Sequence, residues 1–150
     1  MSNEKSKEII NVRVFDVPRE VLFNAWENPA LLAQWWGPKG FRNTFHKFDF
    51  RPEGSWKFTM HAPDGTEFKN ENIFEIIDKP TSIVFRHVEP VHTFRVTVTF
   101  DEQQGKTKLT FRQVFDTDEE YKRVKGIVTE ANEQNFDRLE AVISKNLLKK

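Results

Sequence analysis

A chain of 150 residues is long enough for one domain built around one hydrophobic core. Its 23 basic and 23 acidic side chains give a net charge of zero, which excludes a strong overall field toward nucleic acid or an anionic membrane, and we expect neither as a partner. The chain has no cysteine, which excludes disulfides, thiolate nucleophiles and cysteine-ligated zinc.

The N-terminal segment and the distribution of apolar residues predict a protein that does not insert into a membrane. Residues 1–8 are polar and of mixed charge, unlike a signal peptide, and we expect residues 1–7 to form a disordered tail. No apolar run approaches the ~18 residues that a transmembrane helix needs. The lack of cysteine fits a reducing compartment, so we expect one cytoplasmic domain over residues 1–150.

The first part of the chain predicts one strand followed by two short helices. Apolar and polar residues alternate over 8–14, as in a strand with one buried face. The apolar positions are Ile10, Val12 and Val14, and the polar ones between them are Asn11 and Arg13. Pro18 suits the first turn of a helix, and Asn28 can cap a second helix that ends at Gly37-Pro38.

A period of two then runs from residue 41 to residue 115 and predicts a sheet. Turn signals divide this stretch, and Pro63-Asp64-Gly65 is a strong hairpin turn among them. The expected strands cover 41–50, 55–61, 68–77, 82–88, 92–100 and 107–115. Their short connections imply antiparallel neighbours.

The C-terminal segment predicts one long amphipathic helix that reaches about residue 148. Thr117 and Glu120 have the spacing of a capping box, in which Thr117 caps the helix and Glu120 reaches back. Apolar residues recur at a spacing near 3.6, at Tyr121, Val124, Val128, Ala131, Phe136, Leu139, Ile143 and Leu147. The element order predicts an α+β fold in which this helix crosses the concave face of a curled sheet. A straight helix and a curled sheet pack closely at one end, so we expect a pocket at the other.

Aromatic residues are unusually frequent, with 15 Phe and four Trp. Strand phase and helix spacing bring a set of apolar side chains to the concave side: Trp56, Phe58, Met60, Phe68, Phe94, Phe115 and Phe136. Polar side chains fall among them, namely Asn70, Asn72, His87 and Gln113, while Asn132 and Asn135 interrupt the helix stripe. Such a cavity would hold an apolar molecule and orient its polar end. The alternative is simple packing, with the amides bonded to one another or to loop backbone.

Trp35 and Trp36 are adjacent, so they cannot both face the core from one helix. We expect one to pack and the other to guard the pocket mouth, without knowing which, and Trp36 is included among the candidate ligand-binding residues. The segment 37–40 would then be a mobile gate. The alternative is that both rings cover the edge of the sheet.

Other chemistry finds little support in the sequence. The four histidines are His46, His61, His87 and His92, and none has metal-ligand spacing with another or with an acidic residue, so we expect no metal site and no cofactor. Neither Ser55 nor Ser82 lies in a nucleophile elbow. His87 is the one plausible general acid or base of the pocket, and a solvated histidine at the rim is the alternative.

Several motifs act together as a signature. They are Val17 to Trp26, Asn28-Pro29 with Trp35-Trp36-Gly37-Pro38, the turn from Asp49 to Gly54, Pro63-Asp64-Gly65, and Asn135 to Leu139. This combination resembles the START-like helix-grip superfamily, also called the Bet v-type or SRPBCC fold, and its branch named after the C-terminal domain of the activator of Hsp-90 ATPase. The resemblance implies a curved six- to seven-stranded antiparallel sheet around the C-terminal helix, with two short helices after the first strand.

The sequence departs from the family pattern at two places. Glu53 stands where the first glycine of the turn is usual, and Asn70 and Asn72 stand on a strand that often carries glycine. The two asparagines would shrink the pocket or make it more polar.

Three functions remain open at this stage. The first is binding of a small apolar or amphipathic molecule without chemistry. The second is an enzyme of the cyclase, dehydratase or hydrolase type, with His87 as acid or base and Asn70, Asn72 or Gln113 as hydrogen-bonding partners. The third is a protein-interaction module that regulates a chaperone, as the family name suggests. The ligand, the reaction, the partner and the oligomeric state, including a homodimer, stay undetermined.

Overall fold

Seven strands and three helices are formed by the residues that the computed structural model of the chain describes, 7–88 and 93–148. In chain order they are β1 (Glu8–Phe15), α1 (Arg19–Glu27), α2 (Pro29–Trp35), β2 (Arg42–Phe48), β3 (Ser55–His61), β4 (Glu67–Asp78), β5 (Ser82–Val88), β6 (Thr93–Gln103), β7 (Lys106–Phe115) and α3 (Asp118–Leu148). This order confirms the predicted one. The expected tail over residues 1–6, His92 and the side chain of Leu147 lie outside the described part.

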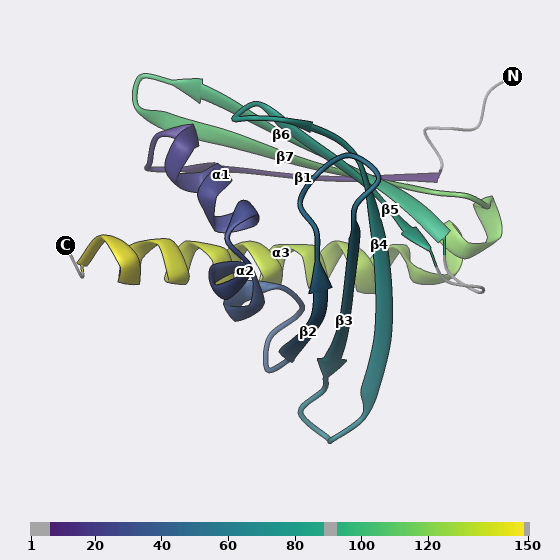
Figure 1. Cartoon of the computed structure of the whole chain (residues 1–150). Helices are drawn as coiled ribbons and strands as arrows, with labels where there is room; N and C mark the ends of the chain where they lie inside the picture. Colours follow the sequence, from purple (N-terminus) through teal and green to yellow (C-terminus); the bar gives the residue numbers. More distant parts are fainter. Residues whose placement is uncertain (1–6, 89–92, 149–150) are drawn as a thin grey trace, which may run out of the picture.

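The strands form one antiparallel sheet in the order β1-β7-β6-β5-β4-β3-β2. β1 and β2 are the two edge strands of this sheet. The chain runs through consecutive hairpins from β2 to β7, and β7 then pairs with β1. Figure 1 shows the sheet curving round α3, with α1 and α2 beside the C-terminal half of that helix. The architecture is the predicted α+β helix-grip fold.

Two β-bulges help to curve the sheet, since an extra residue bends its strand and increases the twist. They lie between Phe45 and Lys47 in β2 and between Phe74 and Ile76 in β4. Strict alternation along β4 would place Ile76 on the inner face with Phe74, and the second bulge reverses the two faces beyond it. Phe74 is buried, but Ile76 is 52% exposed and Ile77 packs against the core in its place.

The alternation in β1 is present, and its apolar side is the exposed one. Ile10, Val12 and Val14 are each about half exposed, whereas Asn11 and Arg13 face α3. The inner face of β1 also carries Ile9 and Phe15, which are buried in the core, and α3 presents acidic side chains to the strand between them. Arg13 makes ion pairs with Glu133, at 3.0 Å, and with Asp137, at 2.8 Å. Burial of the two apolar side chains and these ion pairs together favour the observed face.

The two halves of α3 have different surroundings. In the C-terminal half, Phe136 and Leu139 are fully buried, and the ring of Phe136 contacts those of Phe15 and Phe111 with centroids 6.0 and 6.3 Å away. In the N-terminal half the inward residues are only partly buried: Val124, Val128 and Ala131. The N–H of Glu120 donates to Thr117 Oγ1 at 3.2 Å, which confirms the predicted cap. The helix therefore grips the sheet at one end and stands away from it at the other.

Candidate functional site

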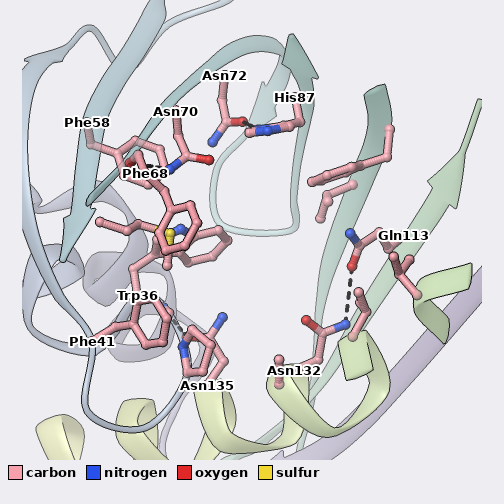
Figure 2. Close-up of a pocket in the computed structure, with 18 of the residues that line it drawn as sticks. Trp36, Phe41, Phe58, Phe68, Asn70, Asn72, His87, Gln113, Asn132 and Asn135 are labelled. Atoms are coloured by element: carbon pink, nitrogen blue, oxygen red, sulfur yellow. Dashed lines mark hydrogen bonds between the residues drawn. The ribbon is translucent and has the colours of Figure 1, made fainter. Parts of the chain in front are cut away.

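A cavity of about 750 Å³ lies between the sheet and the N-terminal half of α3, where the sequence predicts a pocket. Its wall comes from β3 to β7, α3 and the loop between α2 and β2. Figure 2 shows the labelled side chains from the strands facing those from α3 across an open space. The candidate residues that line it are Trp36, Phe58, Met60, Phe68, Asn70, Asn72, His87, Phe94, Gln113 and Phe115.

Two candidate residues, Trp56 and Phe136, do not line the cavity. Trp56 has no exposed surface and lies behind the wall, with its ring 4.8 Å from that of Phe58 and 5.0 Å from that of Trp36. Phe136 packs instead in the hydrophobic core under the C-terminal half of α3. Strand phase gave the correct face for Trp56 and helix spacing gave it for Phe136, but neither pattern distinguishes the pocket wall from the core beside it.

Several wall residues were not among the candidates from sequence. The apolar ones are Phe41, Phe85, Val96, Phe111, Val124, Val128 and Ala131. Val124, Val128 and Ala131 were predicted to face the sheet, and their reduced burial is what marks them as wall. Phe68, at 48% exposed, and Phe41 have ring centroids 6.4 Å apart. Since Phe68 is both exposed and part of the wall, this pair lies at the mouth.

The tryptophan pair divides as the sequence predicts, and Trp36 is the one on the pocket. Trp35 is fully buried, and its Nε1 donates to the carbonyl of Ala25 at 3.0 Å. Trp36 follows the last residue of α2 in extended conformation, so its ring leaves the helix direction and reaches the cavity. Because the helix ends at Trp35, the two adjacent indoles can point in different directions.

His87 and Asn72 form a buried polar pair in the wall. Asn72 is 1% exposed and His87 is 7% exposed, and Asn72 Oδ1 lies 2.8 Å from His87 Nδ1. The imidazole stacks on the ring of Phe94 with centroids 4.7 Å apart. Each of the two side chains therefore has a hydrogen-bond partner within the fold, and both still face the cavity, as Figure 2 shows.

A second polar group joins β1, β7 and α3. Asn132 Nδ2 donates to Gln113 Oε1 at 3.2 Å and to Asn11 Oδ1 at 3.0 Å. Asn11 Nδ2 donates in turn to Glu133 Oε2 at 2.7 Å. The sequence predicts that Gln113 faces the concave side and that Asn132 interrupts the apolar stripe of the helix, and in the structure the two side chains meet. Asn11 was missed; its signal was a polar side chain on the strand face opposite Ile10 and Val12.

The predicted mobile gate over 37–40 is instead a loop held by α3. The Arg138 guanidinium donates five hydrogen bonds of 2.8 to 3.2 Å to backbone carbonyls within this loop and on either side of the loop. The acceptors are Gln34, Trp36, Gly37, Pro38 and Phe41. The N–H of Gly37 also donates to Asn135 Oδ1 at 3.0 Å. Burial lowers the pKa of Arg138 from its ordinary value, but arginine stays charged under physiological conditions.

We expect Arg138→Met to lower the free energy of unfolding by about 1.5–3 kcal/mol, because carbonyls that accept from a charged donor lose it. Urea unfolding measures the loss. Lys122→Met on the same helix breaks an exposed pair with Asp118 and should cost below about 0.5 kcal/mol. Equal effects of the two variants would contradict the loop assignment.

The remaining titratable groups give no metal centre among the described residues. His46 and His61 lie on the outer face of the sheet, with ring nitrogens 2.8 Å from Thr59 Oγ1 and 2.7 Å from Thr44 Oγ1. Within the same residues, none of the helices combines the length and the apolar character needed to cross a membrane.

Comparison with known proteins places this architecture in a family. The sequence model of the activator of Hsp90 ATPase homolog 1-like protein family matches residues 16–144. The chain belongs to this family. The match includes the loop held by Arg138 and the whole sheet except β1. No curated protein matches the sequence.

Solved structures share the fold at low sequence identity. A protein from Arthrobacter aurescens, solved by NMR, has a TM-score of 0.88 and 22% identity, over 97% of this chain and 90% of its own. A crystal structure from Nitrosomonas europaea has a TM-score of 0.86 and 17% identity, over 97% and 99%. A third, from Silicibacter pomeroyi and named for the same family, has a TM-score of 0.76 and 23% identity, over 93% and 99%. These similarities show the helix-grip fold of the family.

Proposed function

We propose that this member of the activator of Hsp90 ATPase homolog 1-like family binds a small apolar or amphipathic molecule in the cavity under α3. The observation that carries the proposal is a space of about 750 Å³ with a mainly aromatic and aliphatic wall. Small-molecule pockets typically occupy about 300–1,000 Å³ and combine an apolar lining with a few convergent polar groups. The amides of Asn72, Gln113 and Asn132 are such groups.

A molecule of this kind gains free energy mainly by leaving water. Each buried methylene contributes about 0.8 kcal/mol, so a chain of about ten carbons contributes about 8 kcal/mol, which offsets the loss of its translational and rotational freedom. The aromatic rings on the wall, including Trp36, Phe58 and Phe94, supply flat apolar surface for it. A chaperone-regulating module would instead use an exposed apolar surface, such as the outer face of β1 with Ile10, Val12 and Val14.

The test is a titration with the neutral dye N-phenyl-1-naphthylamine, whose emission rises in apolar surroundings. We expect saturation at one dye per chain, with a parallel fall in tryptophan emission because Trp36 is part of the wall. Isothermal titration calorimetry should give the same stoichiometry. Absence of saturable binding, or several weak sites per chain, would contradict the proposal.

A second candidate is acid–base catalysis in the same cavity. It is favoured by the placement of His87, a buried imidazole beside Asn72 on the wall. In that case His87→Gln should abolish turnover of a bound compound while leaving dye affinity within about twofold. A ligand recovered unchanged after prolonged incubation with the wild-type protein would favour binding alone.

A further inference from the structure

A chain of hydrogen bonds that starts at Glu133 determines which end of each wall amide donates and which end accepts. A carboxylate only accepts hydrogen bonds, and Glu133 forms an ion pair with Arg13 at 3.0 Å. Asn11 must therefore turn its NH₂ group to Glu133 Oε2, and the same group also reaches the carbonyl of Thr129 at 3.3 Å. Asn11 Oδ1 is then the atom of this amide that can accept a hydrogen bond from another residue of α3.

The next two amides follow from the first. Asn11 Oδ1 requires a donor, so Asn132 presents its NH₂ group, at 3.0 Å. The second hydrogen of that group points to Gln113 at 3.2 Å, so Gln113 must accept with Oε1. Asn132 Oδ1 and Gln113 Nε2 are then the atoms that remain for the cavity, one acceptor and one donor. Figure 2 shows the two side chains meeting at the wall in this orientation.

Asn135 adds a second donor beside them. Its Oδ1 accepts from the backbone N–H of Gly37 at 3.0 Å, and an N–H can only donate, so its Nδ2 is the atom turned away from the loop. Asn132 and Asn135 are three residues apart on α3 and so share one face of the helix. Figure 2 shows the nitrogen of Asn135 directed into the open space.

The charged residues of the wall lie elsewhere. They are Glu67, Lys69, Glu120 and, when protonated, His87. Glu67 and Lys69 are exposed at the start of β4, and Glu120 is twelve residues before Asn132, roughly 18 Å along the helix. The polar patch of Gln113, Asn132 and Asn135 is therefore composed of neutral amides, with no cation of α3 or β7 on the wall to balance an anionic ligand.

We propose, building on ligand binding in this cavity, that it selects molecules whose polar end is an uncharged group carrying both an acceptor and a donor, as in a carboxamide or lactam. The acceptor of such a group takes hydrogen bonds from Gln113 Nε2 and Asn135 Nδ2, and its N–H donates to Asn132 Oδ1. A carboxylate would be desolvated without a cation and would face the oxygen of Asn132. A ketone would leave that oxygen without a donor.

The test compares three probes with similar apolar chains: decanamide, undecan-2-one and decanoate at neutral pH. Each displaces N-phenyl-1-naphthylamine from the wild-type protein. We expect decanamide to bind at least about tenfold more tightly than either of the others, since one unpaired buried polar group corresponds to about that factor. Equal affinities of the amide and the ketone, or preference for decanoate, would overturn the selectivity while leaving the proposed binding intact. If none of the probes displaces the dye and the dye itself does not bind, both proposals are overturned.

Gln113→Met examines the same patch with little change in volume. It removes a donor that the carbonyl of the amide and that of the ketone would both accept, while Asn132 keeps Asn11 as a partner, so the affinities for decanamide and undecan-2-one should both fall, by about fivefold. Gln103→Met, the same substitution at an exposed position of β6, should leave both affinities unchanged. Unchanged affinities in a folded Gln113→Met protein would contradict the assignment. The wild-type probe series decides the question without any variant.

Discussion

Replacing Phe136 with alanine should lower the free energy of unfolding by about 3–5 kcal/mol, the range for a fully buried phenylalanine. The ring is 1% exposed and packs edge-on against Phe15 and Phe111. The guanidinium of Arg13 also lies 5.5 Å from its centroid. Urea unfolding followed by far-UV circular dichroism measures the loss.

Ile127→Ala provides the control for this prediction. Ile127 lies on the same helix but is 74% exposed, so its truncation should change stability by less than about 0.5 kcal/mol. Similar losses for the two variants would mean that α3 does not grip the sheet through its C-terminal half.

Gly54→Ala should destabilise the protein by at least about 3 kcal/mol, because the new methyl group meets backbone that cannot move away. A Cβ there would lie 2.0 Å from the carbonyl oxygen of Asp49 and 2.9 Å from that of Arg51. The turn is also tied to β4, since Gly54 accepts from the N–H of Phe74 at 3.0 Å. Thermal and urea unfolding should both show the loss.

The matched control, Gly126→Ala, should have the opposite sign. Gly126 is an exposed residue within α3, and a Cβ there meets no atom within 4 Å. Alanine favours a helix over glycine by about 0.8–1 kcal/mol, so stability should rise by up to that amount. A Gly54→Ala protein as stable as the wild type would show that the turn is not held as described.

Strand phase predicted most of the pocket, because side chains of a regular strand alternate strictly between faces. Phe58 and Met60 on β3, and Asn70 and Asn72 on β4, are correct for this reason. The rule fails at Ile76, where the β4 bulge inserts one residue and reverses the faces beyond it. Nothing in the local pattern marks that residue as a bulge.

Long-range partners could not be predicted from the sequence. The inward face of β1 depends on the burial of Ile9 and Phe15 and on acidic residues of α3 more than a hundred positions later, which a local analysis of the strand does not include. Arg138 lies within the motif from Asn135 to Leu139, but the loop carbonyls that it binds are about a hundred positions earlier in the chain. Glu53 is a smaller case: its φ of 68° is one that favours glycine, which agrees with the glycine usual there in the family.

The most direct measurement of ligand binding inside the fold is calorimetry of N-phenyl-1-naphthylamine with Ala131→Trp. Ala131 lies on the wall, so an indole there would occupy the cavity, and we expect dye affinity to fall more than about tenfold while the thermal melt stays that of a folded protein. Ile127→Trp, on the exposed side of the same helix, should bind one dye per chain as the wild type does. Unchanged affinity in a folded Ala131→Trp protein would place binding outside the cavity and contradict the account.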